Sequence, residues 1–67
     1  MLKTVLKWKG FNPDNYPFIE FITEWVIKEF EDDILYLEGL YDDGITPSRI
    51  KARITKNGYE AMYEHLI

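Results

Sequence analysis

The side chains of this sequence that could do chemistry are charged rather than nucleophilic. The chain has no cysteine, and His65 is its only histidine. Ser48 follows Pro47 in a stretch typical of a turn, without the neighbouring base or glycine elbow that a serine nucleophile needs. His65 lies near the end of a predicted helix, where a protonated imidazole is favoured as a cap. We therefore expect no enzymatic activity, no metal ion and no cofactor.

Charge is segregated along the chain. Eight Lys and Arg stand against twelve Asp and Glu, which gives a net charge of −4. Seven cations, all but Lys28, lie in residues 3–9 or 49–56, and nine acidic residues lie in 20–43. Cations gathered on one strand can contact phosphates, although the net negative charge predicts weak or no sequence-specific DNA binding. The candidate nucleic-acid contacts are Arg49, Lys51, Arg53 and Lys56.

The acidic residues offer a second kind of surface. Carboxylates gathered on a helical face can dock on a basic protein, or take the place of phosphates in a nucleic-acid channel. Their spacing matches no calcium loop, and the scattered glycines form no phosphate loop. The candidate protein-binding residues are Glu31, Asp32, Asp33, Glu38 and Asp42.

The elements that would position these groups follow from apolar periodicity. Residues 2–9 alternate with a period of two and predict a strand, which ends in the turn chemistry of residues 10–17. Apolar spacings of three and four from residue 18 to residue 30 predict an amphipathic helix. Strict alternation over Arg49–Ile54 predicts a strand with its basic side chains on one face. Thr55 is then expected to cap a short final helix that buries Tyr59, Met62, Tyr63 and Leu66.

The middle of the chain allows more than one interpretation. Residues 17–43 form either one long helix or two with a bend near Glu31, and the acidic run that begins there favours two. Gly39 costs about 1 kcal/mol inside a helix relative to alanine. The competing interpretation makes Ile34–Tyr41 a strand and Asp42-Asp43-Gly44 a hairpin turn. Because the apolar pattern does not alternate cleanly, we favour the helix, and the predicted order is β-α-α-β-α.

The segment Ile34–Met62 resembles the last half of small bacterial and phage winged-helix proteins. Residues 40–45, Leu-Tyr-Asp-Asp-Gly-Ile, are similar to the end of the recognition helix in that family. Residues 54–58, Ile-Thr-Lys-Asn-Gly, are similar to the passage from wing strand to closing helix. The resemblance implies a reduced winged-helix-like domain of the α+β class. The first helix of the family is missing or replaced by residues 2–9, and its recognition helix is acidic here, so contact with nucleic acid falls to the basic wing strand.

We therefore expect a single domain over residues 1–67. No apolar run is long enough to span a membrane and the start is no signal peptide, so we expect a cytoplasmic protein. Its expected function is that of a small regulatory binding module of phage or mobile-element type, contacting nucleic acid or its machinery through the wing. The alternative is an acidic inhibitor or adaptor that docks its helical face on a basic protein. Aromatic residues at Phe18, Phe21 and Trp25 leave a homodimer open.

Overall fold

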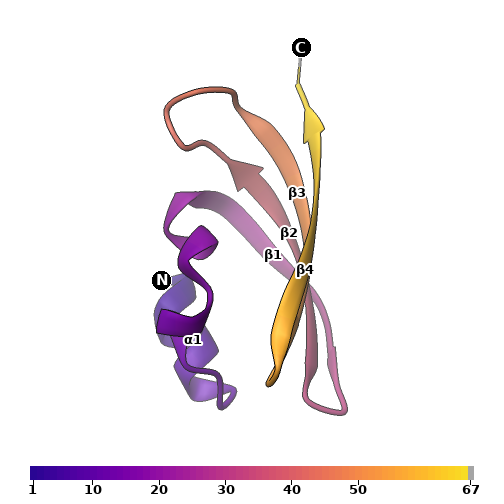
Figure 1. The fold of residues 1–67 in the computed structure, drawn as a ribbon. Helices are drawn as coiled ribbons and strands as arrows, with labels where there is room; N and C mark the ends of the chain where they lie inside the picture. Colours follow the sequence, from indigo (N-terminus) through magenta and orange to yellow (C-terminus); the bar gives the residue numbers. More distant parts are fainter. Residues whose placement is uncertain (67) are drawn as a thin grey trace.

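The computed structural model describes residues 1–66 as a mostly β domain. In chain order its elements are α1 (Leu2–Trp8), the 3₁₀ helices η1 (Pro13–Asn15) and η2 (Pro17–Phe21), and the strands β1 (Ile22–Glu31), β2 (Ile34–Tyr41), β3 (Ser48–Thr55) and β4 (Gly58–His65). The strands form one antiparallel sheet in the order β1-β2-β3-β4. The helical segments lie against one side of it (Figure 1). The predicted β-α-α-β-α order, and the reduced winged-helix-like domain with it, is therefore wrong.

The first element is a helix where alternation predicted a strand. Leu2 and Leu6 stand one helical turn apart and are both buried, whereas Trp8 is 80% exposed. Gly10, at φ +90°, follows the helix, and the N–H of Phe11 donates to the carbonyl of Leu6 over 2.9 Å. This is the bond of a Schellman motif, which a left-handed glycine permits. The alternation of residues 2–9 does not describe which side chains are buried, because Trp8, one of its apolar members, faces solvent.

β1 takes the place of most of the predicted amphipathic helix. Its register with β2 shifts between Thr23 and Val26, and again between Ile27 and Glu29. Each bulge adds a residue to one strand, so a spacing of two becomes a spacing of three. The strand thereby imitates the apolar spacing of a helix, while its β-branched and aromatic content favours extended backbone. The side chains of β1 that reach the core are Ile22, Trp25, Ile27 and Phe30.

The acidic run between the two expected helices is a hairpin turn. Asp32 and Asp33 have φ of +55° and +62°, as a two-residue type I′ turn requires, and aspartate is one of the few residues that visit this region. β2 then pairs antiparallel with both neighbours. The strand alternative for Ile34–Tyr41 is confirmed, and neither one helix nor two spans residues 17–43. A longer connection over residues 42–47 joins β2 to β3, with Gly44 at φ +90°.

β3 confirms the strand predicted over Arg49–Ile54. The predicted final helix is instead β4, and Lys56 and Asn57 form the turn between the two strands. The Thr55 hydroxyl donates to the carbonyl of Gly58 over 3.1 Å, across this turn, rather than capping a helix. Asn57-Gly58, where the turn passes into β4, is a strong hairpin signal in the sequence. This signal outweighs the helical spacing of the apolar residues that follow. Met62, which the predicted helix would have buried, is 71% exposed.

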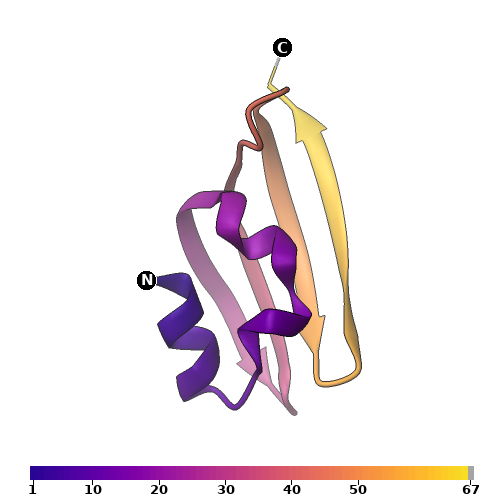
Figure 2. The ribbon, with the colours of Figure 1, turned by 60° about the vertical axis from the view of Figure 1, so that its left-hand side comes forward.

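The core lies between the helical segments and the face of the sheet that they cover (Figure 2). Phe18 and Trp25, whose exposure would have favoured a homodimer, lie in or against it, and Phe21 is 41% exposed. Tyr16 is 1% exposed, and its hydroxyl donates to the backbone carbonyl of Thr55 at the end of β3. The buried members are Leu2, Leu6, Phe11, Tyr16, Phe18, Ile19, Ile22, Leu35, Leu37, Ile50, Ala52 and Ile54.

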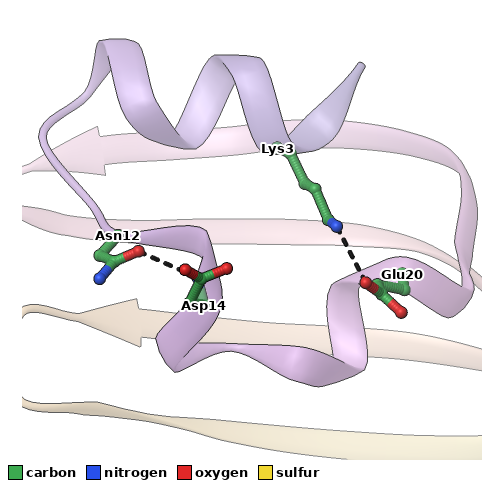
Figure 3. A network of polar contacts seen from close by, with 4 residues as sticks. All are labelled: Lys3, Asn12, Asp14 and Glu20. Atoms are coloured by element: carbon green, nitrogen blue, oxygen red, sulfur yellow. Dashed lines mark hydrogen bonds and ion pairs between the residues drawn. The ribbon is translucent and has the colours of Figure 1, made fainter.

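Polar contacts at the surface tie the helical segments together. The Lys3 Nζ lies 2.9 Å from the Glu20 Oε1, which joins α1 to the end of η2, and the Asn12 Oδ1 accepts from the Asp14 N–H over 3.1 Å (Figure 3). The hydrogen bond and charge of Glu20 raise the pKa of Lys3, and those of Lys3 lower the pKa of Glu20. Because both side chains are exposed, we expect this pair to add little stability.

Candidate binding surface

The sheet has one covered face and one open face. Alternate residues of β2 and β3, such as Leu35, Leu37, Ile50 and Ile54, are buried beneath the helical segments. Their neighbours in the chain therefore point to the other side, over which no helix lies in the described residues (Figures 1 and 2). We call this the outer face. Twelve of its residues pair across the strands: Thr23, Val26 and Glu29 of β1, Tyr36, Glu38 and Leu40 of β2, Arg49, Lys51 and Arg53 of β3, and Glu60, Met62 and Glu64 of β4. Glu24 and Lys28, at the two register shifts of β1, line the same face.

The strand register sets these twelve side chains in three rows. Residues directly opposite one another on one face have Cβ atoms about 4.5–5.5 Å apart, so each row is a line of neighbours. The first row is Glu29, Tyr36, Arg53 and Glu60; the second is Val26, Glu38, Lys51 and Met62; the third is Thr23, Leu40, Arg49 and Glu64.

Three of the four predicted nucleic-acid contacts lie together, on β3 in the middle of the outer face. Each of the three has a carboxylate beside it. The Arg53 Nη1 lies 3.3 Å from the Glu60 Oε1, Lys51 stands opposite Glu38, and Arg49 stands opposite Glu64. The rows hold three cations and four carboxylates, and Lys28 and Glu24 of the β1 bulges add one of each to the face. The basic strand therefore does not make a basic surface.

Lys56, the fourth predicted nucleic-acid contact, lies apart from the other three. It sits in the turn between β3 and β4, and its Nζ donates to the carbonyl of Gly10 over 2.7 Å. The same ammonium lies 5.1 Å from the centroid of the Phe11 ring, within the range of a cation–π contact. Lys56 therefore ties the turn to the N-terminal segment.

The five predicted protein-binding acids do not form one surface. Asp32 and Asp33 make the turn between β1 and β2, and Glu31 precedes them. Glu38 is at the middle of the outer face, and Asp42 lies in the β2–β3 connection at the opposite end of the sheet (Figure 1). The predicted acidic helical face does not exist, because these residues lie on strands and turns.

Sequence reasoning missed the apolar side chains of the outer face. Val26 is 56% exposed, Tyr36 40% and Met62 71%. They stand among the charges of both signs, and a shallow groove of about 710 Å³ runs over this face past Val26, Leu40 and Met62. The Asn57-Gly58 signal could have revealed Met62, because a hairpin there places Glu60, Met62 and Glu64 on the same face as the basic residues.

The covered face has an open end near the β2–β3 connection. A hollow of about 470 Å³ is lined there by Tyr41, Ser48, Tyr63 and His65 among others. Burial raises the pKa of Tyr63, with smaller contributions from nearby groups. The Ser48 Oγ lies 3.4 Å from the His65 Nδ1, but Ser48 is 4% exposed. Its hydroxyl therefore joins the ends of β3 and β4, and His65 ends a strand rather than capping a helix.

In residues 1–66, no three His, Asp or Glu side chains are grouped so that they could hold a metal ion. The same residues contain no helix long and apolar enough to cross a membrane. Models of protein families, curated proteins and solved structures were each compared with this chain, and none matches it.

Proposed function

We propose that this protein is a small, non-enzymatic binding module that contacts a protein partner through the outer face of its sheet. The observation that carries the proposal is the exposure of Val26 and Met62, at 56% and 71%, on a face that no helix within residues 1–66 covers. Apolar side chains among polar ones on an open, shallow surface are typical of protein interfaces. The cytoplasmic location expected from the sequence is part of this proposal.

The charges of the outer face favour a protein over a nucleic acid. Phosphate binding needs cations that are free to displace counterions, whereas Arg49, Lys51 and Arg53 each have a carboxylate across the strand. A protein surface can complement both signs at once, and such complementarity gives specificity. We therefore rank contact with nucleic acid through the basic strand second. The acidic adaptor that the charge pattern of the sequence left as the alternative is retained as a protein-binding function, with the sheet in place of the helical face.

A photo-reactive amino acid in place of Met62 tests the proposal in the cells that produce the protein. Mass spectrometry identifies the cross-linked partner, and the complex is then rebuilt from purified proteins. We expect Val26→Asp and Met62→Asp each to weaken that complex tenfold or more, because each places a charge in the apolar part of the interface. Circular dichroism checks that both variants remain folded.

Trp8→Asp is the matched control, since it exchanges an 80% exposed apolar side chain on α1 for the same charge. Loss of the complex in the control but not in the outer-face variants would refute the proposed surface. A labelled generic DNA duplex provides a second check. Binding that weakens steeply with salt and is abolished by Arg49→Glu with Arg53→Glu would replace the proposal with the nucleic-acid alternative.

A further inference from the structure

The two edges of the sheet differ in how well they could accept another strand. β4 pairs with β3 without a register shift from Gly58, opposite Thr55, to His65, opposite Ser48. In the part of the chain that the structure describes, no strand lies on its other side. Every second residue of an edge strand turns its N–H and C=O away from the sheet, so four of the eight residues of β4 present free backbone groups at regular spacing.

β1, at the opposite edge, lacks this regularity. Its two register shifts interrupt the ladder, and Glu24 within the first has φ +50°. Bulges bend and twist an edge strand and are one of the devices by which proteins prevent further pairing. β4 has no bulge, no proline and no lysine. The open edge of this sheet is therefore β4.

The side chains of β4 indicate what kind of strand fits beside it. Its outer-face residues are Glu60, Met62 and Glu64, and the chain itself pairs the two glutamates with Arg53 and Arg49 of β3. A strand added at the free edge of β4, on the side away from β3, would lie next to the same two carboxylates. Opposite charges on adjacent strands are favourable and like charges are not, so a basic strand fits this edge.

A second copy of this chain fits the edge less well. Antiparallel pairing of β4 with its own copy brings the Glu60 and Glu64 of both copies to one side of two adjacent strands. Centred on Met62, it sets each Glu60 directly opposite a Glu64, a destabilising pair. On the covered side, Tyr59 and Tyr63 are 44% and 48% exposed, so apolar side chains of an added strand would pack against the tyrosine rings.

We propose that the free edge of β4 binds an extended, basic segment of a protein partner as a fifth strand of the sheet. The segment carries Lys or Arg on alternate positions of its outer side and apolar residues on its inner side. Main-chain hydrogen bonds give such strand addition its affinity, and the alternate side chains give it specificity. This inference rests on the proposed function only for the existence of a protein partner.

The test uses a labelled synthetic peptide with the sequence of Ser48–Thr55, because this sequence already pairs with β4 inside the fold. Fluorescence anisotropy measures its affinity for the intact protein, and amide NMR locates the contact. We expect the amides of Tyr59–His65 to shift, and a peptide N-methylated at alternate residues to lose binding. We expect the double variant Glu60→Lys with Glu64→Lys to bind at least tenfold more weakly.

The matched control, Glu29→Lys with Glu31→Lys, makes the same change in net charge on β1 and is expected to alter the affinity less than threefold. If the lysine variant of β4 does not fold, Glu60→Gln with Glu64→Gln removes the charges more gently. Absence of binding at about 1 mM peptide, equal losses in the two double variants, or amide shifts confined to β1 would overturn the inference. So would concentration-dependent pairing of two chains through β4. The peptide assay tests strand addition at β4, and the Val26 and Met62 variants test the outer-face interface. Because the two assays are independent, either proposal can be refuted while the other stands.

Discussion

Replacing Gly39 with alanine discriminates between the sheet and the helix that the sequence favoured. An added Cβ would lie 3.0 Å from the Ile22 Cγ2, 3.1 Å from the Thr23 carbonyl oxygen and 3.1 Å from the Trp25 Cα. Two of these three atoms belong to the backbone of the β1 bulge, which cannot move aside as a side chain can. Overpacking of this kind costs about 1–3 kcal/mol. In a helix the same substitution would instead stabilise the protein by about 1 kcal/mol.

The effect should be large for a protein of this size. A 67-residue domain has a free energy of unfolding of about 3–10 kcal/mol, and a loss of about 2 kcal/mol lowers the Tm by roughly 8–16 °C. Urea unfolding followed by tryptophan fluorescence, together with calorimetry, measures both quantities. Gly44→Ala is the control, because Gly44 has φ +90° but no atom within 4 Å of an added Cβ. A gain in stability for Gly39→Ala would refute the close approach of β1 to β2, whereas a loss at Gly44 reports only the strain of its left-handed φ.

Three further predictions concern Tyr16 and the Lys3–Glu20 pair. Tyr16→Phe should cost about 1–3 kcal/mol, because it leaves the Thr55 carbonyl without its partner; urea unfolding measures the loss, and an unchanged midpoint would contradict the contact. Burial raises the pKa of Tyr16 above 10.0, so the stability that the buried, protonated Tyr16 contributes is complete below pH 10.0 and is lost as the pH rises through the raised pKa. Tyr16→Phe should therefore flatten the alkaline decline of the urea midpoint. An equal decline in both proteins would show that other groups cause it. The Lys3 ammonium holds the pKa of Glu20 below 4.5, so the stability contributed by the ion pair is present above pH 4.5 and is lost as the pH falls through the lowered pKa. In Lys3→Met, the pKa of Glu20 measured by NMR titration should return toward 4.5. An unchanged pKa would exclude the ion pair in solution.

The parts of the fold that could be predicted are those in which each residue's face follows from its immediate neighbours. β3 alternates without interruption, and Arg49–Ile54 was identified as a strand for that reason. β1 could not be identified in this way, because its two bulges are set by pairing with β2, and they change the apolar spacing to one that resembles a helix. The N-terminal helix depends on Leu2 and Leu6 packing against a sheet distant in sequence, which local alternation does not report.

The same distinction applies to the candidate surface. The sequence places Arg49, Lys51 and Arg53 on one face of a strand, and the structure agrees. It does not reveal that Glu38, Glu60 and Glu64 stand across from them, because that depends on the register of three strands. The local signals for the β1–β2 and β3–β4 hairpins are the aspartate pair at 32–33 and Asn57-Gly58. Because both were interpreted as the starts of helices, the register of the strands was not predicted.

The neutralisation that makes β3 a poor phosphate-binding strand also defines the chemistry of the β4 edge. Because Arg49 and Arg53 face Glu64 and Glu60 on one side only, each glutamate keeps a second side toward the free edge. The Arg53–Glu60 pair is exposed, at 40% and 79% of the two side chains, so solvent screening leaves that carboxylate able to attract a further cation. If the β4 edge binds a basic strand, Arg53→Ala should strengthen that binding, because Glu60 loses its competing partner. If the protein instead binds phosphates through β3, Arg53→Ala should weaken binding. The sign of this one change, measured with the labelled peptide and with a labelled duplex, therefore separates the two functions that the charge pattern of the chain allows.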